Sequence, residues 1–541
     1  MRSMALSAEH ARLNLPPDLA FPPRLEPPSF EAAEERAAPR AAVRRASRRS
    51  WLTAFSGGTG VSSDPQLARR DPLLILMHRI TYGFSLPEYE RAKTLGFQGY
   101  LDEQLDHLAI DDAEMTDFLR INYSVTEMSP REVYDNYNAL PVMALELTKG
   151  ALLARAVASR RQLYERLCEF WIDHFNVDHN KGLLWLLVPE FERTVIRPHA
   201  LGSFPAMLTA CAFSGAMLYY LDNWLNVREA PQENYARELL ELHTLGVHGG
   251  YNEGDVDEVA KCFTGWTLIG DNTSPDWLRG TFDPSLHTGG RKFVLWHDIP
   301  DTPIFAKPGD LGGYSDAKRV LDIVSEHPST ADFLARKLLR RFLTPTPPEE
   351  LVARVREAYL TTGGDIRAML RVILTQENLV AHTAVAAPKY RRPFHYMASV
   401  VRAVDGFVPR PSNPLQYLVQ MGHAPYDFEL PTGYPDDFES WGGALQPRWV
   451  FPAMFFRYDR PFRGIHQMTA SALAARIGYA GAADRPGLAE RINERLFGSA
   501  LSGREVGLLQ EFMDTYPAAF DFTALYDTLV LATSMPGFQW H

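Results

Sequence analysis

The chain has 541 residues, which at about 150 residues per domain allows three to four domains or one large helical domain. Apolar residues make up 46% and charged residues 22%, an ordinary globular composition. The formal net charge of -11 argues against a dedicated nucleic-acid binder, which normally carries a basic excess. The three cysteines are too few for a disulfide framework or a four-cysteine zinc site, and no apolar run is long enough to predict a membrane-spanning helix.

Residues 1–70 differ from the rest of the chain in composition. They contain 11 Arg and no Lys against 7 acidic residues, and several of their prolines stand in adjacent pairs that oppose a helix. This composition predicts a mobile, disordered, Pro/Arg-rich arm. The segment at 47–52 is similar to a twin-arginine export motif, but the apolar region that an export signal needs does not follow it. The sequence therefore favours a cytoplasmic location for the protein. An alternative to export is that the basic arm contacts an acidic partner.

From residue 71 onward, apolar residues recur at helical spacing, which predicts an all-α fold. We expect one large, irregular multi-helix domain over 71–541, whose C-terminal helical half spans 315–541. Glycines and prolines interrupt the pattern at 271–300, which predicts a loop insert with a small β-hairpin near 280–297. The predicted helices of the first half lie at 85–108, 138–177 with a break near 158–161, 203–221, 233–245 and 254–263.

The most informative stretch for function is 221–266. An α-helix advances about 100° per residue, so Glu238 and Glu241 share one polar stripe with Arg237. The two carboxylates are suited to binding a metal or to acid–base catalysis, with Arg237 orienting them or binding an anionic substrate. The alternative is a solvated helix face on which Arg237 pairs with Glu233 and Glu241 at i±4 spacing.

Other residues extend this candidate site. His243 falls among apolar residues unless the last helical turn is distorted. Asp222 supplies a further candidate catalytic carboxylate. His297 follows the predicted hairpin in a loop, where binding residues concentrate. We interpret Glu238, Glu241, His174, His243 and His297 as candidate metal ligands. The candidate substrate-binding residues are Trp171, Asn234, Tyr235, Trp266 and Tyr434.

His174 belongs to a second polar segment, Glu169–His179, on a predicted helix. Its spacing fits an ordinary buried histidine, and the alternative is a metal ligand or proton shuttle whose other ring nitrogen is held by a carboxylate. The HExxH, ExxH, GxGxxG, GxxxxGK[ST] and GxSxG patterns are absent. Any metal site must therefore take its ligands from separated segments.

Several motifs together resemble one large bacterial family. They are His78–Phe84, Phe170-Trp171-x-x-His174-Phe175-Asn176-Val177, the stretch Glu233–Gly246, Thr264-Gly265-Trp266, His297-Asp298, His327-Pro328 and Pro431-x-Gly433-Tyr434-Pro435. The family is the one known as domain of unknown function 1800. The resemblance carries no established reaction. It implies a shared pattern that includes His174, Asn234, Arg237, Glu238, Glu241, His243 and His297.

The resemblance also implies a cellular setting. Similar proteins are commonly exported and often encoded beside a sulfatase-like partner, although the chain departs from that pattern at its signal region. Taken together, the sequence predicts an enzyme with a Glu/His/Arg polar cleft, in which a divalent metal ion such as Fe, Mn, Zn or Ca supports hydrolysis or oxidation. The alternative is a non-catalytic binding or assembly module for a secreted partner or a surface polymer, with the polar cluster serving as a structural network.

Overall fold

The computed structural model describes residues 13–16, 18–20, 71–301, 312–383, 389–457, 469–481, 484–516 and 521–541. These residues are mostly helical, which confirms the predicted all-α class. The first half contains α4 (Pro72–Ile80), α5 (Leu86–Leu105), α6 (Ala113–Asn122), α7 (Pro130–Tyr137), α8 (Pro141–Ala158), α9 (Gln162–His174), α10 (Leu184–Phe191), α11 (Arg197–His199), α12 (Phe204–Ala212), α13 (Gly215–Tyr220), α14 (Asn234–Glu238) and α15 (Glu253–Cys262).

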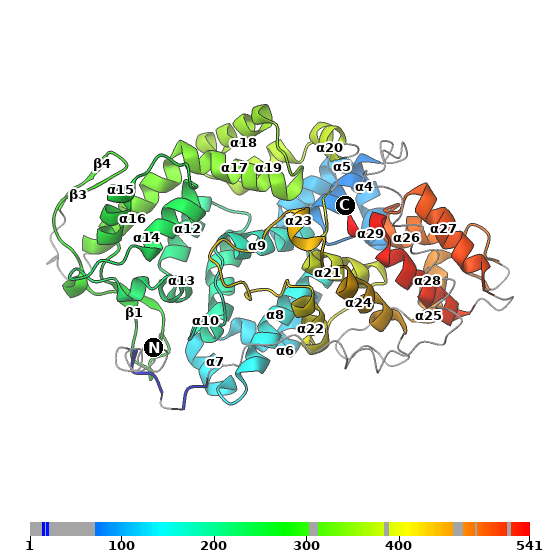
Figure 1. Cartoon of the computed structure of the whole chain (residues 1–541), viewed down its shortest axis with the longest axis horizontal. Coiled ribbons are helices and arrows are strands. Elements are labelled where there is room, and N and C mark those ends of the chain that lie inside the picture. Colours follow the sequence, from blue (N-terminus) through cyan, green and yellow to red (C-terminus); the bar gives the residue numbers. More distant parts are fainter. Residues whose placement is uncertain are drawn as a thin grey trace.

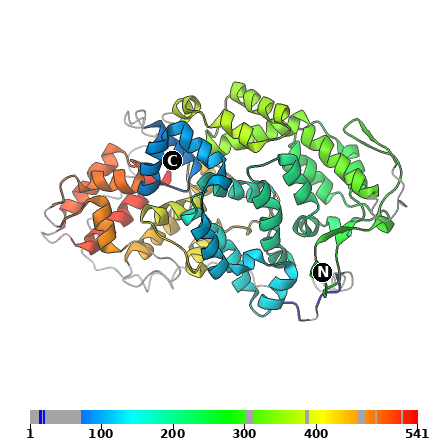
Figure 2. The same cartoon turned by 180° about the vertical axis from the view of Figure 1, so that it is seen from behind.

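The second half is also built from helices. They are α16 (Gly312–Glu326), α17 (Pro328–Phe342), α18 (Glu349–Thr362), α19 (Ile366–Ile373), α20 (Gln376–Thr383), α21 (Pro393–Ala403), α22 (Ser412–Gln420), α23 (Phe438–Trp441), α24 (Leu445–Arg457), α25 (Ala470–Ile477), α26 (Leu488–Phe497), α27 (Gly503–Asp514), α28 (Phe522–Ser534) and α29 (Pro536–Gln539). Figure 1 places α16–α19 along one edge and α25–α28 at one end, with α8–α10 near the middle. Seen from behind, α16–α19 again lie along the upper edge and α25–α28 at the opposite end from the two small sheets (Figure 2). Among the described residues, no helix combines the length and apolarity needed to cross a bilayer.

The predicted interruption near 158–161 is present and has a local cause. Helix α8 ends at Ala158 and α9 begins at Gln162, whose buried side chain turns back over the end of α8. Its Nε2 donates to the carbonyl oxygens of Ala156 and Ser159 at 3.1 and 2.8 Å. These bonds satisfy carbonyl groups that a helix end otherwise leaves open.

The predicted helix over 233–245 forms, but its second half is a π-helix. Helix α14 runs directly into η6 (Leu239–Thr244), and the amide of Leu245 donates to the carbonyl oxygen of Leu240 at 2.9 Å. Such wider turns are uncommon and often occur at functional sites. His243 is buried within η6, as its apolar surroundings in the sequence indicate.

Two small antiparallel sheets lie within the predicted insert and just before it. Strands β3 (Lys292–Val294) and β4 (His297–Ile299) form a hairpin in the predicted region, and its two-residue turn holds Leu295 and Trp296 at positive φ. Strands β1 (Trp266–Leu268) and β2 (Gly280–Phe282) form a second sheet that the sequence did not reveal. Strands of three residues are too short to show the alternation on which strand prediction depends.

Part of the predicted N-terminal arm is packed against the protein. The side chains of Leu13, Leu15 and Leu19 are buried in the main apolar core. The Tyr134 hydroxyl donates to Asp18 at 2.5 Å, which fixes this segment to α7. These few residues of the predicted arm therefore contact the helical domain through buried apolar side chains. The rest of 1–70, including the twin-arginine-like segment, lies outside the described residues.

A buried ion network joins α9 to α17 and to the start of α21. The carboxylate of Glu169 accepts hydrogen bonds from Arg341 at 2.6 Å, from Tyr82 at 2.8 Å and from Arg392. Arg392 also pairs with Asp173 at 2.5 Å. Burial raises the pKa of Glu169, but the charges of Arg341 and Arg392 outweigh burial and hold the pKa well below its usual value. This network fixes the helix that carries His174.

Candidate functional site

The predicted carboxylate stripe lies on a partly exposed helix face. Arg237 forms a two-bond contact with Glu253 at 2.8 and 2.9 Å and pairs with Glu233 at 3.0 Å. The Glu233 pairing follows the solvated-face alternative, whereas the Glu253 contact comes from the start of α15 and was not predicted. Burial and the nearby charge of Glu241 raise the pKa of Glu238. Glu238 and Glu241 are therefore neighbours, whereas Arg237 pairs with Glu233 and Glu253.

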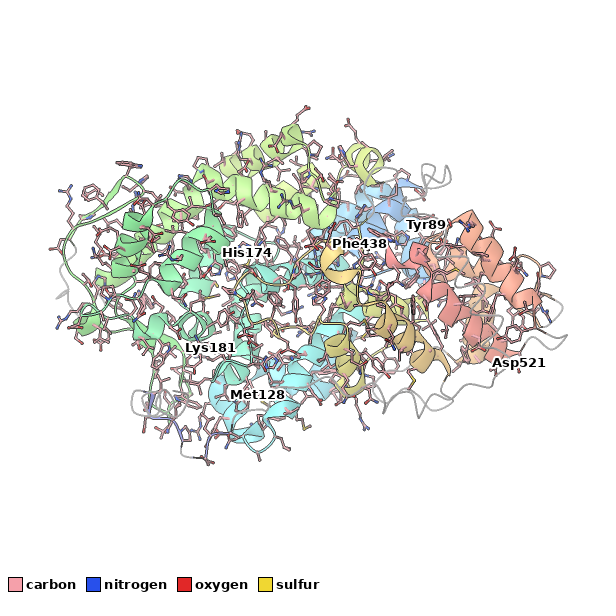
Figure 3. The ribbon with its side chains drawn as sticks, in the orientation of Figure 1. Tyr89, Met128, His174, Lys181, Phe438 and Asp521 are labelled. Carbon is pink, nitrogen blue, oxygen red and sulfur yellow. The ribbon has the colours of Figure 1, made fainter. Side chains whose placement is uncertain are left out.

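His174 is buried near the middle of the molecule (Figure 3). Its Nε2 donates to the carbonyl oxygen of His243 at 3.0 Å, and its Nδ1 accepts from Nζ of Lys337 at 2.9 Å. The structure thus brings His174 and His243 together, through the backbone of η6. Burial and the Lys337 charge lower the pKa of both histidines, that of His243 to about 3, so both rings are neutral at neutral pH.

Most of the predicted aromatic binding residues belong to the core. Trp171 is buried, and its indole N–H donates to the carbonyl oxygen of Ala200 at 3.0 Å. Tyr235 is also buried, and Trp266 stacks on Phe213 with ring centroids 3.9 Å apart. Tyr434 is buried as well, and its hydroxyl donates to the carbonyl oxygen of Ala424. These side chains therefore pack the interior of the protein.

The remaining predicted residues are dispersed. His297 is exposed on β4, which Figure 1 places at one end of the molecule, away from α9. Asn234 is exposed and donates to the carbonyl oxygen of Leu221 at 3.2 Å. Asp222 has a left-handed backbone and pairs with Lys181 at 2.7 Å.

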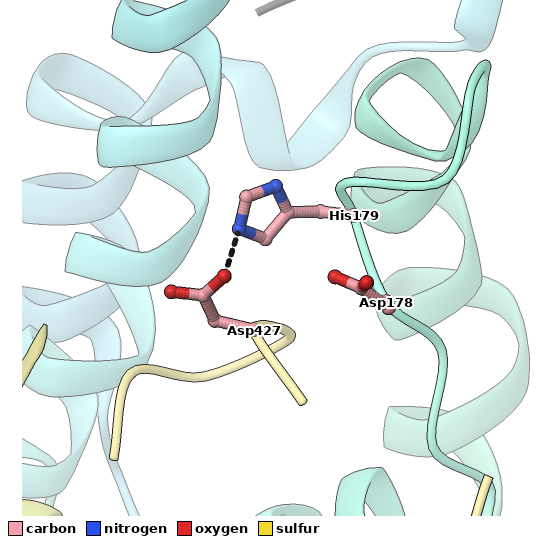
Figure 4. Close-up of side chains that lie close together, drawn as sticks. All are labelled: Asp178, His179 and Asp427. Carbon is pink, nitrogen blue, oxygen red and sulfur yellow. Dashed lines mark ion pairs between the residues drawn. The ribbon is translucent and has the colours of Figure 1, made fainter. Parts of the chain in front are cut away.

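A different cluster brings three potential metal ligands together. One ligand atom from each of Asp178, His179 and Asp427 lies within 4.8 Å of the other two, and within the described ranges no other such group is found. Figure 4 shows the three side chains converging from two segments. Nε2 of His179 lies 3.1 Å from Oδ1 of Asp427. Asp178 and His179 are buried, and Asp427 is 18% exposed.

Backbone and amide contacts align the two segments that carry this cluster. The first segment connects α9 to α10, and the second connects α22 to α23. The amide N–H of His179 donates to the carbonyl oxygen of Tyr426 at 2.9 Å. The Asn180 side-chain amide donates to both Asp178 and Asp427 at 2.7 Å. Asn176 donates to two further carbonyl oxygens of the second segment, so the carboxylates are held in place by several bonds.

A buried lysine completes the cluster. Nζ of Lys149, on α8, lies 2.7 Å from Nε2 of His179 and 3.9 Å from Oδ2 of Asp427. Burial lowers the pKa of Lys149, and burial together with the Lys149 charge lowers the pKa of His179. Burial raises the pKa of Asp427, but the hydrogen bond from His179 and the charge of Lys149 outweigh it and lower the pKa to about 2. Asp427 is therefore ionised at neutral pH.

The cluster adjoins one predicted site residue. Lys181 follows Asn180 directly, and its Nζ donates to Asp222 and to the carbonyl oxygen of Tyr220, both at 2.7 Å. The Tyr220 hydroxyl in turn donates to the carbonyl oxygen of Glu429 at 2.8 Å, in the segment that carries Asp427. Asp222 thus lies at the border of the observed cluster.

Two cavities in the described structure lie elsewhere. One, of about 450 Å³, is bordered by the start of α5, the break after α8 and the end of α21, and Arg402 and Glu88 help to line it. The other, of about 420 Å³, lies between β4 and α16. None of the predicted site residues lines either cavity.

Comparison with known proteins identifies the family. The family model described as "Protein of unknown function (DUF1800)" matches residues 75–540. The chain belongs to the DUF1800 family. No curated protein and no solved structure matches it. Membership confirms the resemblance found in the sequence and assigns no reaction to this DUF1800 chain.

Sequence reasoning missed the cluster for a definite reason. Asp178 and His179 stand in the second polar segment, directly after a buried helix, and that position could have marked them as candidates. Asp427 lies 248 residues beyond His179, and nothing in its local sequence connects it to that helix. The pairing of the two segments is visible only in three dimensions.

Proposed function

We propose that the protein is a metal-dependent enzyme whose divalent cation is bound by Asp178, His179 and Asp427. The observation that carries this proposal is the convergence of two carboxylates and one imidazole within 4.8 Å. This mixed O and N donor set suits Mn, Fe or Zn. A cation held there would acidify a bound water or polarise a substrate oxygen, chemistry that serves hydrolysis or oxidation.

The charge of the cluster supports a cation. Asp427 is ionised and lies close to a second carboxylate, Asp178, while burial lowers the pKa of the two nearby nitrogen bases, His179 and Lys149. Two carboxylates brought together in a largely buried setting are costly unless a cation neutralises them. A divalent ion supplies that positive charge.

The hydrogen bonds of His179 point the same way. Its Nδ1 is buried and has no hydrogen-bond partner among the described residues. If Nε2 carries the proton, it bonds to Asp427 but opposes the ammonium of Lys149, which is also a donor. If Nδ1 carries the proton, Nε2 faces the Asp427 oxygen with two lone pairs opposed. A cation bound at Nε2 replaces the opposed lone pairs with a coordinate bond, and the ring stays neutral because its proton is then on Nδ1.

Metal content tests the proposal directly. We would load the purified chain with Mn²⁺ or Zn²⁺, remove excess ion and count metal per chain. Wild type should retain about one ion, and Asp427→Asn and His179→Gln should retain less than about 0.1, since each loses a ligand. Glu238→Gln and His174→Ala are matched controls that should retain the ion. Melting curves verify that each variant is folded.

Two results would overturn the proposal. The first is a wild-type content below about 0.1 ion per chain, and the second is a Glu238→Gln variant that loses the ion while Asp427→Asn keeps it. The first result, with a lowered melting temperature for Asp427→Asn, favours the non-catalytic alternative, in which the cluster is a polar network that fastens two segments together. The second places the metal on the helix stripe predicted from sequence.

A further inference from the structure

Lys337 is a lysine in an unusual position, separate from the metal-ligand cluster. It lies on α17, is partly buried, and donates through Nζ to Nδ1 of His174. Its Nζ also lies 5.3 Å from the centre of the Phe333 ring. Among the residues that the structure describes, no carboxylate forms an ion pair with Lys337.

The hydrogen bond to His174 has a fixed direction. Because Nε2 of His174 faces the carbonyl oxygen of His243, that nitrogen must carry the ring proton. Nδ1 therefore offers a lone pair to Lys337. The ring is enclosed by aromatic side chains, with the Phe175 ring 4.5 Å and the Trp171 ring 5.3 Å away. A second proton on this ring is disfavoured, so His174 can accept a proton only transiently.

Charges from each neighbouring element act on the amine. Burial lowers the pKa of Lys337 to about 8; Asp173 from α9 opposes this, and Arg340 from α17 adds to it. His243 from η6 is neutral. The Asp173 carboxylate is already engaged with Arg392 at 2.5 Å. The lowered pKa increases the unprotonated fraction of the amine at pH 7 relative to that of an ordinary lysine.

We infer that Lys337 is a nucleophilic amine that forms an imine with an aldehyde or ketone, with His174 as its proton acceptor. The nitrogen lone pair forms a bond to the carbonyl carbon, and a proton passes from nitrogen to Nδ1 of His174. The carbonyl oxygen takes up the two protons that nitrogen loses, one of them returned by His174, and leaves as water when the carbon–oxygen bond breaks, so amine and carbonyl compound give imine and water without an oxidant or reductant. The contact between base and nucleophile is already at hydrogen-bond distance.

Reductive trapping tests this inference. The full chain would be incubated with propanal and cyanoborohydride at pH 7, and the alkylated lysines would be quantified by peptide mapping. We expect Lys337 to react at least ten-fold faster than Lys93, a surface lysine paired with Glu90. The rate at Lys337 should rise with pH and level off above about 8, and Lys337→Arg should lose only this adduct.

The role of His174 needs its own measurement. His174→Phe keeps an aromatic ring but removes the proton acceptor, and we expect the Lys337 rate to fall at least five-fold while the Lys93 rate is unchanged. Should that variant fail to fold, the wild-type comparison still decides. Equal labelling of Lys337 and Lys93, or a Lys337 rate that still rises steeply above pH 9, would overturn the inference. Metal content plays no part in this assay, so it succeeds or fails independently of the proposed metal site.

Discussion

The ion network around Glu169 gives the sharpest prediction for stability. Glu169→Gln keeps the shape of the side chain but removes the charge that Arg341 and Arg392 share. Breaking a buried ion pair on one side typically costs about 3–5 kcal/mol, because the remaining charges stay buried without compensation. The entropy of unfolding near the melting temperature is about 2.1 cal/mol/K per residue, or roughly 1.1 kcal/mol/K for 541 residues. The melting temperature should therefore fall by about 3–4 °C if the chain unfolds cooperatively.

Differential scanning calorimetry measures this shift, and Glu253→Gln is the matched control. Glu253 also accepts two hydrogen bonds from an arginine, Arg237, but its side chain is 77% exposed. Exposed ion pairs contribute little, so this variant should melt with wild type. Equal shifts for the two substitutions would refute the argument, since burial is the main difference between the two pairs.

The other predictions concern the segment that carries Asp427. Gly433→Ala should lower the melting temperature, because φ at Gly433 is +71° and the added Cβ would lie 2.0 Å from the carbonyl oxygen of Asp173. Gly443→Ala is the control and should melt with wild type, because open space surrounds Gly443. Equal melting temperatures for the two variants would contradict this account of the packing. The pKa of Asp427 is lowered in the folded state, so its contribution of roughly 2 kcal/mol is present above pH 4 and is lost as pH falls towards about 2. Acid unfolding of Asp427→Asn should accordingly lose less stability over that interval than wild type, and identical pH profiles would be inconsistent with this assignment.

The sequence predicted local structure better than tertiary contacts. The break after α8 was visible because its residues interrupt an apolar period, and the helix over 233–245 was visible from its polar stripe. The widening of η6 was not, since one additional residue in a turn leaves the apolar pattern almost unchanged. Leu13, Leu15 and Leu19 were hidden by the surrounding prolines and arginines, which dominate the composition of that segment.

The candidate site shows the same limit more clearly. Arg237 was correctly placed beside Glu233 at i±4 spacing, but its contact with Glu253 depends on how α15 packs. His174 is buried, as the spacing indicated, but the alternative that placed a carboxylate on its second nitrogen is not observed, since that nitrogen contacts Lys337, from 163 residues further along the chain. Partners at such separations leave no periodic signal, so they could not be read from the order of residues.

The distance along the chain between His179 and Asp427 has a consequence for biosynthesis. Ribosomes add roughly 5–20 residues per second, so about 10–50 s separate the emergence of the two residues. During that interval the nascent polypeptide contains Lys149 and His179 but not Asp427, the carboxylate that lies beside both in the folded protein. A polypeptide truncated before Asp427 would therefore lack the complete cluster, even if its N-terminal helices fold.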